Sequence, residues 1–167
     1  MQKLYLDCDG VILDTINKSY EILKKMGIIQ PEEIGKFFYD LDWNEFINHA
    51  GEIDNSIEKI KKLLSIGLYD IKILTHVYSN VESMAKINYF KVILPEVEVI
   101  TVMKDIKKAD AVDPTGAILV DDYLPNLDYW YEKKGIPVKF SDSGKPSKYT
   151  VITDLLDLLS INFDKIM

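Results

Sequence analysis

Five short runs of apolar residues predict five buried strands, at residues 4–6, 70–75, 97–102, 117–120 and 136–140. Between the later runs, apolar residues recur at helical spacing, so strands and helices alternate along the chain. This order predicts an α/β fold with a parallel five-stranded sheet, right-handed crossovers and helices on both faces. A last amphipathic helix is expected over residues 153–160. Ligands of such sheets bind outside the carboxyl ends of the strands.

The segment between the first two strands is too long for a single crossover. It holds one helical pattern at residues 17–26, a second that opens at Pro31, and a third that ends near residue 65, capped by Asp54 or Asn55. We therefore expect a small helical domain at 16–67, inserted into a core formed by 1–15 and 68–167. The middle of the insertion is rich in aromatic residues: Phe37, Phe38, Tyr39, Trp43 and Phe46.

Composition narrows the class of protein. The 167 residues suit one domain with a small insertion, and 47% hydrophobic residues suffice for a core. The net charge of −7 argues against a broad nucleic-acid-binding surface. The single cysteine, Cys8, cannot form an internal disulfide and is expected to be a small core residue. With no signal-peptide pattern and no apolar run of about 18 residues, we expect a cytoplasmic protein without a membrane segment.

The first strand ends in two carboxylates, Asp7 and Asp9, followed by Gly10. Side chains two residues apart on a strand point the same way, so these like charges repel unless a cation or a shared proton intervenes. Gly10 permits a sharp turn immediately after them. Such a pair is a poor choice for stability, which indicates a functional site at this strand end.

Two further strands end in residues that extend this pattern. The second strand ends in Thr75, followed by His76, and the fourth strand runs directly into Asp121 and Asp122. Four carboxylates at the tips of two neighbouring strands would repel one another strongly. A hard dication with oxygen ligands, such as Mg²⁺, relieves that repulsion and also neutralises a phosphoryl group.

The stretch DCDGVILDT and the later DD pair resemble motifs of the haloacid dehalogenase (HAD) superfamily of phosphohydrolases. The resemblance implies a HAD-like Rossmannoid core with a small helical C1 cap after the first strand. It makes Asp7 the nucleophile and Asp9 the general acid/base, and both are expected to contact Mg²⁺, Asp9 through its backbone carbonyl. Thr75 would hydrogen-bond a phosphate oxygen. Asp122 would bind the metal directly, and Asp121 directly or through water.

The resemblance also requires a lysine between the third and fourth strands, to hold the nucleophile and the phosphate. Lys108 is the first candidate, Lys104 is the alternative and a substrate-contact candidate, and Lys107 lies between them. Backbone N–H groups at Gly10 are expected to meet the phosphate, because the chain turns there towards a helix. His76 is a further candidate substrate contact.

Two stretches, LVDDYLPNLDYW and GIPVKF, resemble the 5'-nucleotidase branch of this superfamily, which includes the 5'(3')-deoxyribonucleotidases. The expected substrate is then a (deoxy)nucleoside monophosphate. Phe38 and Trp43 are our candidates for stacking on its base, because aromatic side chains stack on any base.

Several alternatives stay open. They are a phosphatase for a sugar phosphate, a phosphatase for a nucleic-acid 3'-phosphate end, and a binding or regulatory module that keeps the fold without activity. Self-association into a homodimer is possible, since surfaces of helical caps often self-associate.

Overall fold

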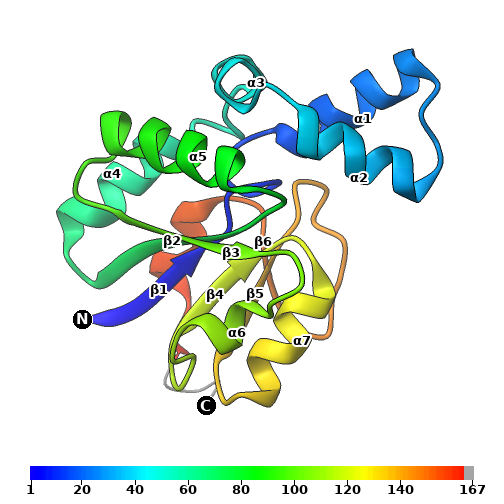
Figure 1. Ribbon diagram of the computed structural model, residues 1–167. Coiled ribbons are helices and arrows are strands. Elements are labelled where there is room, and N and C mark those ends of the chain that lie inside the picture. Colours follow the sequence, from blue (N-terminus) through cyan, green and yellow to red (C-terminus); the bar gives the residue numbers. More distant parts are fainter. Residues whose placement is uncertain (164–167) are drawn as a thin grey trace.

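The computed structural model describes residues 1–163 and contains a six-stranded sheet in which all neighbouring strands are parallel (Figure 1). The strands lie in the order β3-β2-β1-β4-β5-β6, so the first strand of the chain occupies the middle of the sheet. The strands are β1 Gln2–Leu6, β2 Tyr69–Val77, β3 Glu98–Met103, β4 Ile118–Asp121, β5 Ile136–Phe140 and β6 Thr150–Ile152.

Helices connect the strands, and none of those in residues 1–163 is long and apolar enough to cross a membrane. Local sequence explains several helix ends: Pro31 starts one helix, Gly27 ends another in the left-handed conformation, and the Ser79 side chain caps a third. The helices are α1 Thr15–Met26, α2 Pro31–Asp40, α3 Trp43–Ala50, α4 Ser56–Ile66, α5 Asn80–Ile93, α6 Lys108–Ala111, α7 Leu124–Glu132 and the 3₁₀ helix η1 Leu155–Ser160.

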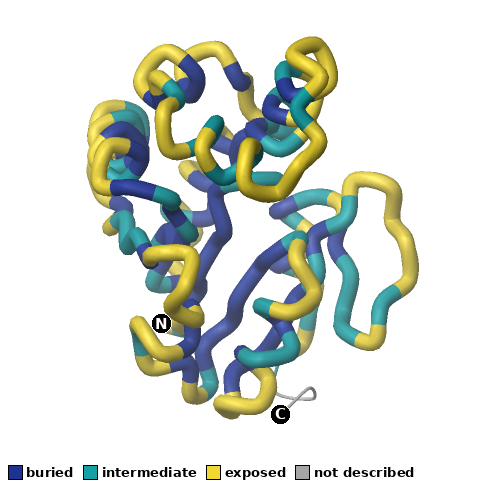
Figure 2. Tube along the Cα trace, turned by 45° about the vertical axis from the view of Figure 1, so that its right-hand side comes forward, coloured by how far each residue is buried: buried dark blue, intermediate teal, exposed yellow. Residues whose placement is uncertain are grey.

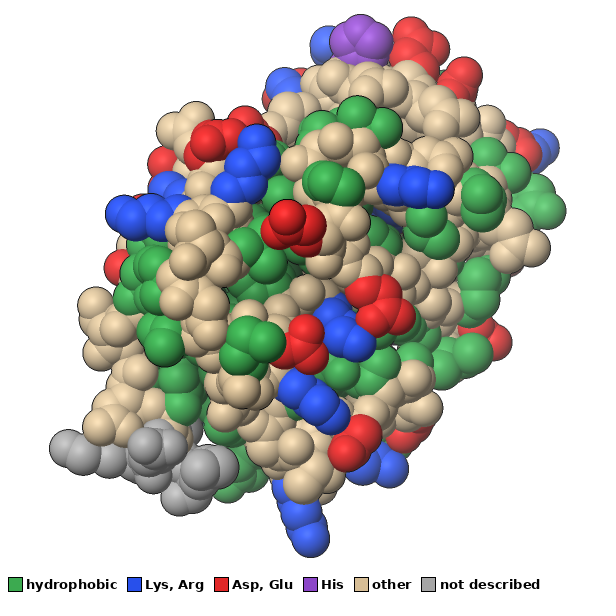
Figure 3. All heavy atoms as spheres, turned by 90° about the vertical axis from the view of Figure 1, so that its left-hand side faces the viewer, with side chains coloured by type: hydrophobic (Ala, Val, Ile, Leu, Met, Phe, Trp, Pro, Cys, Tyr) green, Lys and Arg blue, Asp and Glu red, His purple; other side chains and the backbone are tan. Residues whose placement is uncertain are grey.

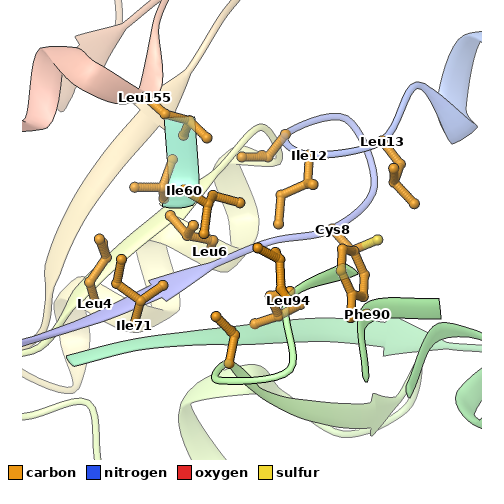
Figure 4. Close-up of a cluster of buried hydrophobic side chains, with 14 of the residues drawn as sticks. Leu4, Leu6, Cys8, Ile12, Leu13, Ile60, Ile71, Phe90, Leu94 and Leu155 are labelled. Carbon is orange, nitrogen blue, oxygen red and sulfur yellow. The ribbon is translucent and has the colours of Figure 1, made fainter. Parts of the chain in front are cut away.

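Hydrophobic side chains bury both faces of the sheet, as the burial pattern of the strands shows (Figure 2). On one face, Leu4 and Leu6 of β1 contact the cluster that includes Ile60 of α4 and Phe90 of α5 (Figure 4). Cys8 is fully buried in this cluster, as predicted. On the other face, α6 and α7 cover a second cluster: Tyr5, Leu74, Val102, Ala109, Ala117, Leu119, Leu127 and Trp130. The predicted α/β fold with a parallel sheet is confirmed.

The four helices between β1 and β2 occupy two places. Helices α1, α2 and α3 lie beyond the carboxyl ends of the strands, above the sheet in Figure 1. Helix α4 instead packs against the sheet, where Ile57, Ile60 and Leu63 join the core formed with η1. The segment predicted as an insertion, 16–67, therefore contains three helices that lie over the strand ends and one helix, α4, that packs on a face of the sheet.

Two expectations about the C-terminal part were wrong. The sheet has six strands rather than five, because Thr150–Ile152 pairs in parallel with β5. All three residues of this strand are β-branched, which favours a strand, but a run of three is too short to predict one from sequence. The helix expected over residues 153–160 is a 3₁₀ helix of six residues, Leu155–Ser160. Asp154 and Asp157 form a capping box at its start.

Gly135 lies where α7 leads into β5, and a Cβ there would overlap the ring of Trp130. That ring is fully buried and donates its N–H to the carbonyl of Ala117 at 2.9 Å. We expect Gly135→Ala to lower the free energy of unfolding by about 1–3 kcal/mol, the usual effect of overpacking a core. Denaturant titration measures this change.

Gly35→Ala is the matched control. Gly35 lies within α2 and has open space where a Cβ would be added. The added methyl group should raise the free energy of unfolding by about 0.5–1 kcal/mol, because alanine favours a helix interior over glycine. Equal effects of the two substitutions would contradict the packing around Trp130.

Candidate active site

Strand register places the predicted nucleophile beside the predicted metal ligands. Leu6 of β1 pairs with Val120 of β4, so the next residues, Asp7 and Asp121, lie at the same level of adjacent strands. The backbone N–H of Asp7 donates to the carbonyl of Val120 at 2.9 Å. Thr75 lies near the end of β2, which pairs with the other side of β1 and continues to Val77, two residues beyond the predicted end. The strand ends therefore bring three predicted site residues together.

Three carboxylates form a compact cluster at this edge. Asp7, Asp121 and Asp122 each offer an oxygen within 4.8 Å of the others. Asp7 and Asp121 are buried, whereas Asp122 is half-buried. Burial, followed by the charge of Asp121, raises the pKa of Asp7 to about 8, and the same two causes raise the pKa of Asp122 to about 6. Oxygen donors whose charges destabilise one another fit a hard cation such as Mg²⁺.

Lys108 is the lysine that reaches this cluster. Its ammonium is buried and lies 2.7 Å from an oxygen of Asp7 and 2.7 Å from an oxygen of Asp121. The charges of these two carboxylates raise the pKa of Lys108 although burial opposes them. Of the other two candidate lysines, Lys104 lies 5.0 Å from the ring centroid of Tyr78, and Lys107 lies 4.6 Å from that of Tyr129.

Gly10 makes room for Asp122. Its φ is +78°, and a Cβ added there would overlap the carboxylate of Asp122. The turn that follows is closed by the carbonyl of Cys8, which accepts hydrogen bonds from the N–H groups of Ile12 and Leu13 at 2.9 Å each. Glycine is therefore needed at this position both for backbone conformation and for close approach.

Asp9, the predicted general acid/base, is held by hydrogen bonds on both carboxylate oxygens. Thr15 donates to Oδ1 at 2.7 Å. On Oδ2, the ammonium of Lys86 donates at 2.6 Å and the hydroxyl of Thr75 at 3.2 Å. Burial would raise the pKa of Asp9, but the charge and hydrogen bond of Lys86, with the hydrogen bond of Thr15, lower it on balance.

Two cavities that share Asp9, Ile16, His76 and Lys104 in their walls lie at the site. One, of about 460 Å³, is lined by Asp7, Asp9 and Asp122 together with His76, Lys104 and Lys107. The His76 Nε2 atom lies 2.9 Å from the carbonyl oxygen of Ile106.

The second cavity, of about 260 Å³, lies between Asp9 and helices α1–α3. Phe38 and Trp43, the predicted base-stacking residues, are both in its wall. The ring of Phe38 is nearly parallel to those of Tyr78 and Trp43, with centroids 4.8 Å and 6.1 Å away, respectively. Trp43 is only 3% exposed and donates its N–H to the carbonyl of Phe38. These rings therefore serve as packing within the wall as well as candidate substrate contacts.

Two residues that contact Asp9 were not identified by sequence analysis. They are Thr15 and Lys86. Thr15 is the last residue of the DCDGVILDT stretch, which could have singled it out. Lys86 lies within a helix among ordinary helical residues, and no local pattern distinguishes it from a surface lysine.

No protein-family model matches this sequence, and no curated protein sequence matches it. Solved structures do match in fold. A HAD-superfamily hydrolase from Ehrlichia chaffeensis is 14% identical, with a TM-score of 0.59 over 96% of each chain. A hydrolase from Pseudomonas syringae is 14% identical, with a TM-score of 0.61 over 100% of each chain. The D,D-heptose 1,7-bisphosphate phosphatase from B. bronchiseptica, complexed with magnesium and phosphate, is 12% identical, with a TM-score of 0.57 over 99% of this chain and 98% of that one.

Identities this low establish the fold and leave the branch within the superfamily a prediction. The resemblance first drawn from the motifs is supported at that level. The chain has the α/β fold of the HAD-superfamily hydrolases, with its acidic cluster at the carboxyl ends of the central strands.

Proposed function

We propose that the protein is a Mg²⁺-dependent phosphomonoester hydrolase that works through an aspartyl-phosphate intermediate. One observation carries the proposal. The Asp7 carboxylate, at the end of the central strand, lies between a buried lysine and two further carboxylates, and Asp9 follows it at the mouth of a cavity. On this proposal, a nucleophile, a cation site and a proton-transfer group lie together at the ends of two neighbouring strands, β1 and β4.

The first half of the reaction is nucleophilic displacement at phosphorus. An oxygen of Asp7 attacks in line and forms a bond to phosphorus while the bond to the leaving oxygen breaks. In this proposal Lys108, which contacts Asp7, and Thr75, which contacts Asp9, stabilise negative charge on the transferring group. Asp9 delivers a proton to the leaving alkoxide. The phosphoryl group is then attached to Asp7.

In the second half, water hydrolyses the aspartyl phosphate. Asp9 removes a proton from that water, and the hydroxide formed attacks phosphorus and releases Asp7. The residues that would hold Mg²⁺ are Asp7, Asp121 and Asp122, with the backbone carbonyl of Asp9. When bound there, Mg²⁺ supplies charge neutralisation between these carboxylates and a phosphoryl group.

Helices α1–α3 form the cap in this proposal, and the 260 Å³ cavity beneath them receives the leaving group. Five of the residues in its wall are aromatic: Tyr20, Phe38, Trp43, Phe46 and Tyr78. They favour a nucleoside monophosphate over a small polar ester, because base–aromatic contacts stabilise binding. Lys104 and His76 also line the cavity of about 460 Å³, and in this proposal they contact the phosphate or the ribose.

A nucleic-acid 3'-phosphate end is the less favoured substrate. Such a ligand needs a basic surface along its backbone. The net charge is −7, and acidic and basic side chains are interspersed on the face seen in Figure 3. A sugar phosphate remains the competing small substrate and is separated from a nucleotide by assay.

We expect Mg²⁺-dependent phosphate release from nucleoside monophosphates, and a loss of at least about 10³-fold in turnover for Asp7→Asn, since the amide cannot act as the nucleophile. Phosphate release is measured across nucleotides, sugar phosphates and 3'-phosphorylated oligonucleotides. Faster turnover of a sugar phosphate would replace the proposed substrate. Near wild-type activity of Asp7→Asn would overturn the mechanism, and absence of activity on every ester would indicate a binding module.

The same variant should be more stable than wild type when Mg²⁺ is removed by a chelator. The pKa of Asp7 is raised to about 8 in the folded protein, compared with about 4 in an unfolded chain. Between these pH values the folded state binds a proton that the unfolded state does not, so the stability of wild type falls as pH rises. The stability gain from Asp7→Asn should therefore grow between about pH 4 and pH 8. Thermal melts across this range test it, and a gain independent of pH would contradict it.

Phe38→Leu should lower kcat/KM for a nucleotide by about tenfold while sparing a small alkyl phosphate, since one base–aromatic contact is worth at least about 1 kcal/mol. Leucine keeps the position apolar and preserves the fold better than alanine. Phe37→Leu is the control, because Phe37 neighbours Phe38 without lining the cavity. Equal losses on both substrates would assign Phe38 to the core alone.

A further inference from the structure

The Lys86 ammonium lies at the centre of a buried network next to the candidate active site. Its side chain is fully buried. It donates to Asp9 at 2.6 Å, to the hydroxyl of Thr75 at 3.1 Å and to the carbonyl of His76 at 3.0 Å. A fourth contact, at 2.7 Å, joins it to Glu82, one turn earlier on α5. Three of the four partners therefore belong to the strand ends and one to its own helix.

Anchoring α5 to the sheet does not explain this placement. Phe90 of α5 is fully buried in the core, and Ala85 is nearly so. The hydroxyl of Ser83 also lies 2.8 Å from that of Thr101 on β3, outside the site. The helix thus has apolar and polar anchors of its own. A buried lysine adds little to such docking, because burying an ion pair is costly in desolvation.

The electrostatic surroundings of Asp9 explain the placement better. The carboxylates of Asp7 and Asp122 line the same cavity as Asp9. Repulsion from them would drive the Asp9 carboxylate, which is 25% exposed, away from its place on the turn. The Lys86 ammonium attracts the same carboxylate at 2.6 Å. The same ammonium holds the Thr75 hydroxyl, which in turn donates to Asp9.

We propose that Lys86 is a positioning residue of the active site, which holds the Asp9 carboxylate and the Thr75 hydroxyl where proton transfer and phosphate binding need them. This inference rests on the proposed phosphatase function. Lys86 is fully buried and lines neither of the two cavities at the site. It acts by fixing the geometry of groups that contact the substrate, and errors of about 1 Å in such groups reduce rates by about a hundredfold.

The test compares two esters of similar size that differ in their need for a proton on the leaving group. 4-Nitrophenyl phosphate releases a stable phenolate, whereas 4-nitrobenzyl phosphate releases an alkoxide that needs general-acid help. Lys86→Met keeps the length of the side chain without its charge. The double variant Lys86→Met/Glu82→Gln also removes the charge of Glu82, which would otherwise be left buried without its lysine partner. In wild type the N–H of Tyr78 donates to the Glu82 carboxylate, and the amide oxygen of glutamine can still accept that hydrogen bond.

We expect the double variant to fold and to bind Mg²⁺ with wild-type affinity. Its kcat on the benzyl ester should fall about tenfold or more beyond any fall on the phenyl ester, and KM should change little, since proton transfer contributes about 10²–10⁴ to such rates. Asp9→Asn, which removes the proposed proton donor itself, should give the largest change in the ratio of kcat between the two esters. Ser83→Ala is the control for α5 docking and should leave the ratio unchanged.

A ratio of the two esters within about twofold of wild type in both Lys86 variants would overturn the positioning role, because 0.4 kcal/mol is all that such a factor represents. A ratio shifted towards the benzyl ester would also overturn it. Absence of Mg²⁺-dependent activity in wild type would overturn the proposed function, and this inference with it. An active wild type with an unchanged ratio in the variants would overturn this inference alone.

Discussion

The site depends on two buried lysines, each shared between two carboxylates. Lys108 joins Asp7 to Asp121, and Lys86 joins Asp9 to Glu82. Without these cations, the carboxylates at the end of β1 would face one another in a poorly solvated environment, where unpaired charges are costly. Each lysine balances half of the negative charge around it. The remainder is what makes the strand end suited to a cation and a phosphoryl group.

Much of this arrangement follows from the sequence because strand order and register are simple to infer. A buried run that ends in Asp7 and another that ends in Asp121 must meet if the two strands are neighbours in a parallel sheet. The same argument brings Thr75 to the edge from the other side of β1. Alternation of strands and helices predicts the fold class. These inferences need only the direction and neighbourhood of strands.

The rest required coordinates, since it depends on side-chain reach or on marginal local preferences. Lys86 lies on a helix, and only the packing of α5 against β2 brings its ammonium to Asp9. The choice of Lys108 from three lysines likewise depends on the four-residue helix α6, too short to be found from periodicity. Thr150–Ile152 became a strand only because the edge of β5 offered it a partner. Tertiary context decides such short segments.

The Asp9 carboxylate accepts hydrogen bonds from two helices, one of which, α1, belongs to the segment between β1 and β2. Thr15, the first residue of α1, donates to one oxygen at 2.7 Å, and Lys86 of α5 donates to the other at 2.6 Å. The Lys86 ammonium also lies 5.5 Å from the ring centroid of Trp43, in the wall of the 260 Å³ cavity. A displacement of α1 or α3 would therefore alter the contacts that hold Asp9. One set of contacts therefore shapes the cavity and orients the Asp9 carboxylate. In the proposed reaction, this couples the residues that select the leaving alcohol to the residue that protonates it.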